Sequence, residues 1–261
     1  MKPTRSVPDP WRVLSRVTSA RVGLGRAGGS LPTRALLEFQ LAHARARDAV
    51  HRELDDAALA RALEDAGHEV LRLHSAARDR AEYIARPDRG RILDDASRRA
   101  LEARPAAKAD CALVVVDGLS AAAVEAHAAP LLAALVPALR AEGWALAPVA
   151  IVRQGRVAVG DEVGALLGVA MTVLLVGERP GLSSPDSLGV YLTWDPVPGR
   201  SNAERNCLSN VRPPEGLSYE LAAHKLRYLM AESRRLRLSG VGLKEDAPAL
   251  PSPGAGGVAL E

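Results

Sequence analysis

Apolar residues recur with helical spacing through the first hundred positions and later gather into short continuous runs. Spacing of three or four residues is typical of a helix that buries one face, whereas continuous aliphatic runs of about four to eight residues are typical of strands buried on both faces. We therefore expect no strong strand before residue 105. The helices predicted in this part are about Arg34–Arg52, Asp56–Glu64, Val70–Tyr83 and Asp94–Ala103, with Thr33 as a helix cap.

Beyond residues 105–110, which we interpret as a hinge, strand-like and helix-like segments alternate. Such alternation is typical of a parallel, doubly wound sheet. The predicted fold class is α/β, with an N-terminal all-helical domain followed by a Rossmann-like parallel-sheet domain. Its predicted strands are Cys111–Val116, Ala147–Val152 and Met171–Val176, with a small turn and strand in 153–159, and its helices are about Ala121–Ala141 (capped by Ser120), Glu162–Val169 and Leu221–Leu238.

Composition shifts divide the chain into four predicted segments. They are a basic N-terminal arm at 1–30, the helical domain at 31–107, the Rossmann-like domain at 108–246 and a disordered Pro/Gly/Ala-rich tail at 247–261. In the arm, six basic residues face one acid, and Trp11, Leu14 and Val17 would share one side of a short helix over Trp11–Ser19. We interpret this segment as a partly ordered arm that needs a partner surface, with a targeting arm or a flexible terminus as alternatives.

The charge balance disfavours nucleic-acid binding. The formal net charge is +3, with thirty arginines and four lysines against 31 acidic residues, and the acids are interleaved with the bases. Aromatic residues make up only 3%, so no basic block stands beside rings that could stack on bases. Two distant cysteines, Cys111 and Cys207, indicate neither a disulfide framework nor a metal site. With no long apolar run and no signal-peptide pattern, we expect a soluble, cytoplasmic protein without a membrane span.

The stretch from Met171 to Asn210 carries the most promising chemistry. A buried strand ends at Gly177, and Glu178 follows at the position where open α/β sheets bind their ligands. Glu178 could pair with Arg179, accept hydrogen bonds from the amides of a ligand or act as a base. A turn with Ser183 and Ser184, a second apolar segment at 188–194 and a loop containing Asn206, Cys207 and Asn210 complete the stretch, and Arg205 could lower the pKa of the Cys207 thiol.

Known catalytic motifs are missing from the sequence. There is no GxSxG, P-loop, HExxH or CxxC pattern, and the residues of the stretch favour binding rather than transforming a ligand. Residues 23–28 match GxGxxG, but neither a preceding strand nor an immediately following helix supports a dinucleotide site. We favour a glycine loop that comes close to a partner or ligand. A stand-alone nucleotide-binding module using this loop, and a purely structural scaffold, remain as alternatives.

A series of motifs resembles one protein family, the small (light) subunits of ethanolamine ammonia-lyase. The motifs occur in that family's order and span about Arg21 to Lys244. The segments at 177–187 (Gly-Glu-Arg-Pro-Gly-Leu-Ser-Ser-Pro-Asp-Ser) and 203–207 (Ala-Glu-Arg-Asn-Cys) are the most distinctive. The others are Arg21–Thr33, Phe39–Ala44, Arg47–His51, Arg86–Arg91, Asp117–Ser120, Gln154–Ala158 and Gly160–Glu162.

The resemblance implies a lyase that uses adenosylcobalamin to convert ethanolamine to acetaldehyde and ammonia by radical chemistry. It implies that a large subunit with a TIM barrel holds the substrate, in a hetero-oligomer with several copies of each chain. The cobalamin contacts of the small subunit map onto Val157, Glu178 and Cys207, and no catalytic residue or metal ligand is expected in this chain. The expected location is the cytoplasm, with a bacterial microcompartment as a special case.

Overall fold

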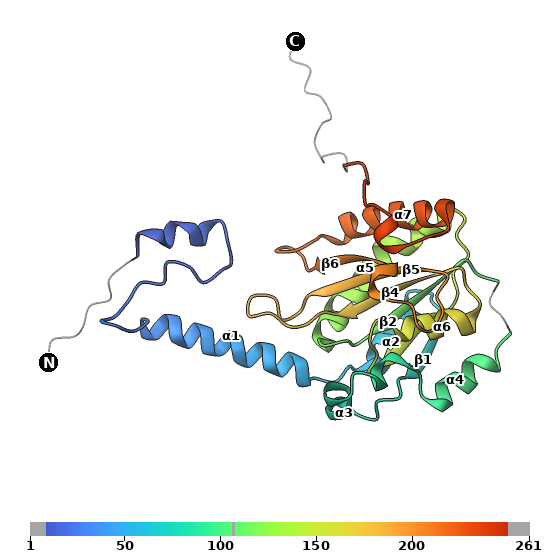
Figure 1. Ribbon diagram of the computed structural model, residues 1–261, viewed down its shortest axis with the longest axis horizontal. Coiled ribbons are helices and arrows are strands. Elements are labelled where there is room, and N and C mark those ends of the chain that lie inside the picture. Colours follow the sequence, from blue (N-terminus) through green and yellow to red (C-terminus); the bar gives the residue numbers. More distant parts are fainter. Residues whose placement is uncertain (1–8, 106–107, 250–261) are drawn as a thin grey trace, which may run out of the picture.

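A six-stranded mixed sheet forms the centre of the computed structural model, which describes residues 9–105 and 108–249 (Figure 1). Most of the expected disordered tail, residues 250–261, lies outside these ranges. The strand order is β1-β3-β2-β4-β5-β6. The strands are β1 (Val70–His74), β2 (Cys111–Val116), β3 (Val149–Arg153), β4 (Met171–Gly177), β5 (Leu188–Trp194) and β6 (Arg205–Val211).

The first four strands are parallel, but β5 and β6 are antiparallel to their neighbours. The expectation of an entirely parallel sheet is wrong on this side. Ten residues, 178–187, connect β4 to β5, and a parallel connection needs a crossover of about a dozen residues or more. The short connection therefore makes a hairpin. The region expected to be a loop around Cys207 is the edge strand β6, paired with β5.

Helices cover both faces of the sheet. Alternate residues of β2 point to opposite sides, so Leu113 and Val115 join one core and Val114 and Val116 the other. The first core lies under α5, α7 and α2, and the second under α6 and α4 (Figure 1). The helices are α1 (Thr33–His51), α2 (Asp56–Asp65), α3 (Arg80–Ala85), α4 (Asp95–Glu102), α5 (Ala121–Ala141), α6 (Val159–Leu167) and α7 (Tyr219–Leu236).

Local signals placed most of these elements correctly. Strand β2 and helix α5 have the predicted bounds, and the Ser120 side chain caps α5 by accepting the Ala123 N–H. At α1, Pro32 occupies the cap position and Thr33 is the first helical residue, so the cap expected of Thr33 is wrong. The strand expected within 153–159 is a turn that enters α6. Short 3₁₀ helices cover Pro10–Arg16 (η1), Arg89–Arg91 (η2), Asn202–Glu204 (η3) and Gly240–Gly242 (η4).

The helix predicted over residues 70–83 is wrong. Residues Val70–His74 form β1, which pairs in parallel with β3, and only Arg80–Ala85 are helical. The all-helical interpretation of residues 31–107 therefore fails at this strand, because it completes the sheet of the C-terminal half. Strand β1 is an edge strand of five residues, and its partner lies more than seventy positions away. No local period marks it.

Helix α5 is the one described helix that is long and apolar enough to cross a membrane by length and composition. It packs instead on the sheet beside α7, and side chains such as Leu131, Leu132 and Leu135 are fully buried. Its apolar character is therefore explained by its place in the core.

The N-terminal arm and α1 extend away from the sheet (Figure 1). Of the nineteen residues of α1, only Ala46 and Ala49 are buried. The predicted short helix is η1, at Pro10–Arg16, and Trp11 and Leu14 on it are exposed.

Candidate functional site

Loops that follow β2, β3 and β4 meet at the carboxyl edge of the parallel strands and enclose a cavity of about 410 Å³. Val157, from the loop after β3, and Glu178, from the end of β4, both line it. Two of the three expected contact residues are thus brought together. The full lining is Tyr83, Gly118, Leu119, Arg156, Val157, Val176, Gly177, Glu178, Arg179 and Tyr191.

Two of the loops that line this cavity pack closely through their backbones. Gly118 has φ +56°, and a Cβ there would lie 2.2 Å from the Gly177 carbonyl oxygen. Only glycine allows both this backbone conformation and this approach. The loops after β2 and β4 therefore lie directly against each other beside the cavity.

The Glu178 carboxylate is held by donors from the β4–β5 connection and from strand β6. It accepts hydrogen bonds from the Ser187 hydroxyl, from the Ser209 hydroxyl at 2.5 Å and from the Asn210 backbone N–H at 3.2 Å. A carboxylate has about four acceptor positions, so about one remains for a ligand. Sequence reasoning missed Ser187 and Ser209, because β-sheet pairing brings them to Glu178.

Cys207 lies beside the cavity rather than in its wall. It is opposite Tyr191 in the β5–β6 pairing, and Tyr191 lines the cavity. Desolvation raises the pKa of the Cys207 thiol, so the expected lowering by Arg205 is wrong. The Arg205 guanidinium is instead engaged by the buried Asp161, at 2.5 and 2.6 Å. Cys207 is consequently a neutral thiol at physiological pH.

A buried carboxylate holds the turn that presents Val157. Asp117, at the end of β2, accepts the backbone N–H groups of Gln154 and Gly155, both at 2.9 Å. Burial raises the pKa of Asp117 to about 6, although Arg80, whose Nη1 lies 3.7 Å away, opposes the shift. The sequence pattern did not single out Asp117 for this role.

Tyr83 forms one wall of the cavity between two guanidinium groups. The Arg80 and Arg156 guanidinium carbons lie 4.7 and 4.5 Å from its ring centroid, distances typical of cation–π contacts. Burial raises the pKa of Tyr83 to about 12, so its hydroxyl stays protonated. Arg80 also donates to the carbonyl oxygens of Val50 and Gly118, at 2.6 and 2.8 Å, and so connects the end of α1 to the site.

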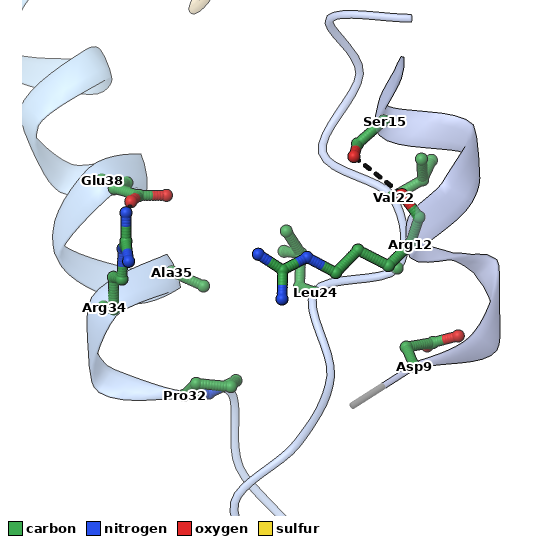
Figure 2. A pocket seen from close by; sticks show the side chains of 10 residues that line it. Asp9, Arg12, Ser15, Val22, Leu24, Pro32, Arg34, Ala35 and Glu38 are labelled. Carbon is green, nitrogen blue, oxygen red and sulfur yellow. Dashed lines mark hydrogen bonds and ion pairs between the residues drawn. The ribbon is translucent and has the colours of Figure 1, made fainter. Parts of the chain in front are cut away.

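The glycine loop of the arm lies apart from this site. Figure 2 shows the cavity of about 420 Å³ between η1 and the start of α1, with Arg12 pointing into it. A Cβ at Gly23 would lie 2.4 Å from the Arg12 backbone nitrogen, so this glycine serves the packing of the arm on itself. Helix η1 precedes the loop where a dinucleotide site needs a strand, which opposes the nucleotide-binding alternative.

The main cavity combines an apolar surface with one acceptor and two cations. Among the described residues that line it, Glu178 is the only carboxylate, and there is no histidine or cysteine. This set suits a ligand with amide groups and offers no acid–base pair. The fold and site therefore define an α/β protein with an open candidate binding cavity at its sheet edge.

Comparisons with known proteins identify the family. The profile of the ethanolamine ammonia-lyase light chain matches residues 8–244. Relatives named ethanolamine ammonia-lyase small subunit include one from Ralstonia nicotianae, 59% identical over 94% of this chain and 92% of its own. One from Azotobacter vinelandii is 59% identical over 95% and 93%, and one from Pseudomonas paraeruginosa is 56% identical over 94% and 90%. The chain belongs to the family of ethanolamine ammonia-lyase small subunits.

Proposed function

We propose that this chain binds adenosylcobalamin together with a large subunit, in a lyase that converts ethanolamine to acetaldehyde and ammonia. The meeting of Val157 and Glu178 in one cavity carries the proposal, because the resemblance implies a cofactor contact at each of these two residues. Cys207, the third such residue, lies next to Tyr191 at the rim.

The side chains that line the cavity fit one side of a cobalamin. A corrin ring is wide, apolar on its faces and edged with amide side chains. The remaining acceptor position of Glu178 suits an amide N–H, and Val157, Val176 and Leu119 offer apolar contact. The cofactor is far larger than a cavity of about 410 Å³, so most of it would lie outside this chain. The site is therefore half of a binding site.

When bound, adenosylcobalamin supplies radical chemistry through its cobalt–carbon bond, and the protein supplies binding and orientation. In this chain, Glu178 would fix the rotation of the corrin by holding an amide edge. Val157 would exclude water from the cavity, and the neutral Cys207 would pack as a small apolar group. Substrate-binding and acid–base groups are proposed to lie on the large subunit.

Exposed apolar residues support a partner. Of fourteen exposed large hydrophobic residues in the described part of the chain, nine lie between positions 11 and 41, including Trp11, Leu37 and Phe39. Such concentration is typical of a protein–protein contact. The arm also contacts the β4–β5 hairpin, because Arg21 Nη2 lies 3.5 Å from the carbonyl oxygen of Leu182. We infer that the large subunit covers this surface and the cavity together.

Co-purification with a large subunit tests the proposal. The complex should take up a corrinoid, visible in its absorption spectrum, and gain lyase activity with adenosylcobalamin and ethanolamine. The chain alone should show no activity. Full activity without a partner, or a complex that never binds a corrinoid, would contradict the proposal.

A further inference from the structure

Two cavities meet at Arg156. The main cavity and a second one of about 310 Å³ are both lined by Arg156 and Val157. The second cavity extends the site away from Glu178, and Arg91, Arg200 and Asn202 line it. The combined surface thus has a carboxylate at one end and arginines at the other.

Two of the three arginines of the second cavity are not neutralised by a carboxylate of the described residues. Arg200 is neutralised by Asp195 at 2.6 Å and Glu204 at 2.7 Å. Arg91 and Arg156, by contrast, form no ion pair with any carboxylate in residues 9–105 and 108–249. The second cavity is therefore a cationic surface suited to a single anionic group.

Arg156 is held in place along one side of its guanidinium. The group stacks on Tyr83, and its Nη2 donates to the Tyr83 carbonyl oxygen at 3.0 Å. The backbone N–H of Arg156 donates to the Gly90 carbonyl oxygen at 2.7 Å, which fixes the backbone from which the side chain extends. Nη1 has no hydrogen-bond partner among the described residues, and it is not fully buried. Nη1 is thus a preorganised donor that faces solvent. Arg156 would therefore lose little side-chain entropy when a ligand binds.

We propose that Arg156, assisted by Arg91, binds the phosphodiester in the nucleotide tail of cobalamin. This inference rests on the proposed function and adds an orientation to it. The amide edge of the corrin would meet Glu178, and the phosphate of the tail would lie beyond Val157 in the second cavity. Guanidinium groups match phosphate oxygens in geometry and charge, whereas a carboxylate such as Glu178 would repel them.

A pair of corrinoids tests this assignment in the complex with the large subunit. Cyanocobalamin carries the nucleotide tail and its phosphate, and dicyanocobinamide lacks both. Binding of each is measured by visible absorption for the native complex and for Arg156→Gln, Arg156→Lys and Arg91→Gln. The matched control is Arg89→Gln, an exposed arginine in the same 3₁₀ turn as Arg91 that lines neither cavity.

We expect Arg156→Gln to weaken cyanocobalamin binding about tenfold to hundredfold, the cost of losing a charge-assisted hydrogen bond. Cobinamide binding should change less than about twofold, since uncharged parts of the ligand keep their contacts. Arg156→Lys should recover part of the loss, and Arg89→Gln should bind as the native complex does. The ³¹P resonance of bound cyanocobalamin should move towards that of free cyanocobalamin in Arg156→Gln, a readout that needs no cobinamide binding.

Equal losses for both corrinoids would assign Arg156 a structural role and overturn the inference. An unchanged ³¹P resonance would also overturn it. Weakened assembly with the large subunit, together with unchanged corrinoid binding, would overturn it as well, because it would indicate a carboxylate of the partner as the bound anion. Failure of the native complex to bind cyanocobalamin at all is a different result, which would contradict the proposed function itself.

Discussion

The buried carboxylate of Asp117 should give this protein an unusual pH dependence of stability. Burial raises its pKa in the folded chain to about 6, from the ordinary value of 3.8 for an unperturbed aspartate. Because the folded state binds this proton more tightly than the unfolded state, Asp117 favours folding at low pH and this contribution is lost as the pH rises. Most carboxylates act in the opposite sense, since ion pairs and hydrogen bonds lower their pKa values.

The size of the effect follows from the shift. About two pKa units, at about 1.4 kcal/mol each, correspond to about 3 kcal/mol of unfolding free energy lost between about pH 4 and pH 6. Asp117 is 1% exposed, so solvent screening reduces this little. The fold keeps a carboxylate at this buried position despite the cost at neutral pH, because the backbone N–H groups of Gln154 and Gly155 need an acceptor there.

Urea denaturation of the native chain and of Asp117→Asn, at several pH values from 4 to 7.5, measures this contribution. The asparagine does not titrate, so the difference between the two unfolding free energies should change by about 3 kcal/mol across the window, with the native chain losing relative stability as the pH rises. Other titrating groups cancel in the difference. Parallel curves for the two proteins would refute the reasoning.

Three further substitutions separate the site, the partner surface and the core. Glu178→Ala should weaken corrinoid binding by the complex about tenfold or more, since an amide of the ligand loses a charged acceptor. The control Ser183→Ala should have no effect. Equal corrinoid affinities of the native and Glu178→Ala complexes in a spectral titration would remove Glu178 from the site. Leu37→Lys should weaken co-purification with the large subunit and leave the melting temperature unchanged, because Leu37 is 57% exposed. The control Val241→Lys changes a residue that is 75% exposed outside the arm, and equal effects of both would contradict a specific surface. Leu132→Ala should lower the unfolding free energy by about 2–5 kcal/mol in urea, and a loss below about 1 kcal/mol would contradict its core position.

The sequence alone determined the central elements of the fold. The Val-rich run at 111–116 is buried on both faces, and the Ala/Leu-rich segment after Ser120 is a helix in the core, because strand and helix signals of this kind are local. The place of the candidate site was also predictable. Glu178 directly follows a buried strand, and sheet geometry alone puts the end of such a strand at the edge where open α/β sheets bind their ligands.

The tertiary structure decided what depends on long-range pairing. Strand β1 exists because β3 hydrogen-bonds to it, and β5 and β6 reverse direction because their connections are short. The donors of Glu178 follow from the same pairing, since Ser209 lies thirty-one positions away and reaches the carboxylate only in the observed register. Likewise, Tyr83 becomes a wall of the site only when Arg80 and Arg156 stack on it. Such contacts have no sequence period, because their free energy depends on three-dimensional register and burial rather than on spacing along the chain.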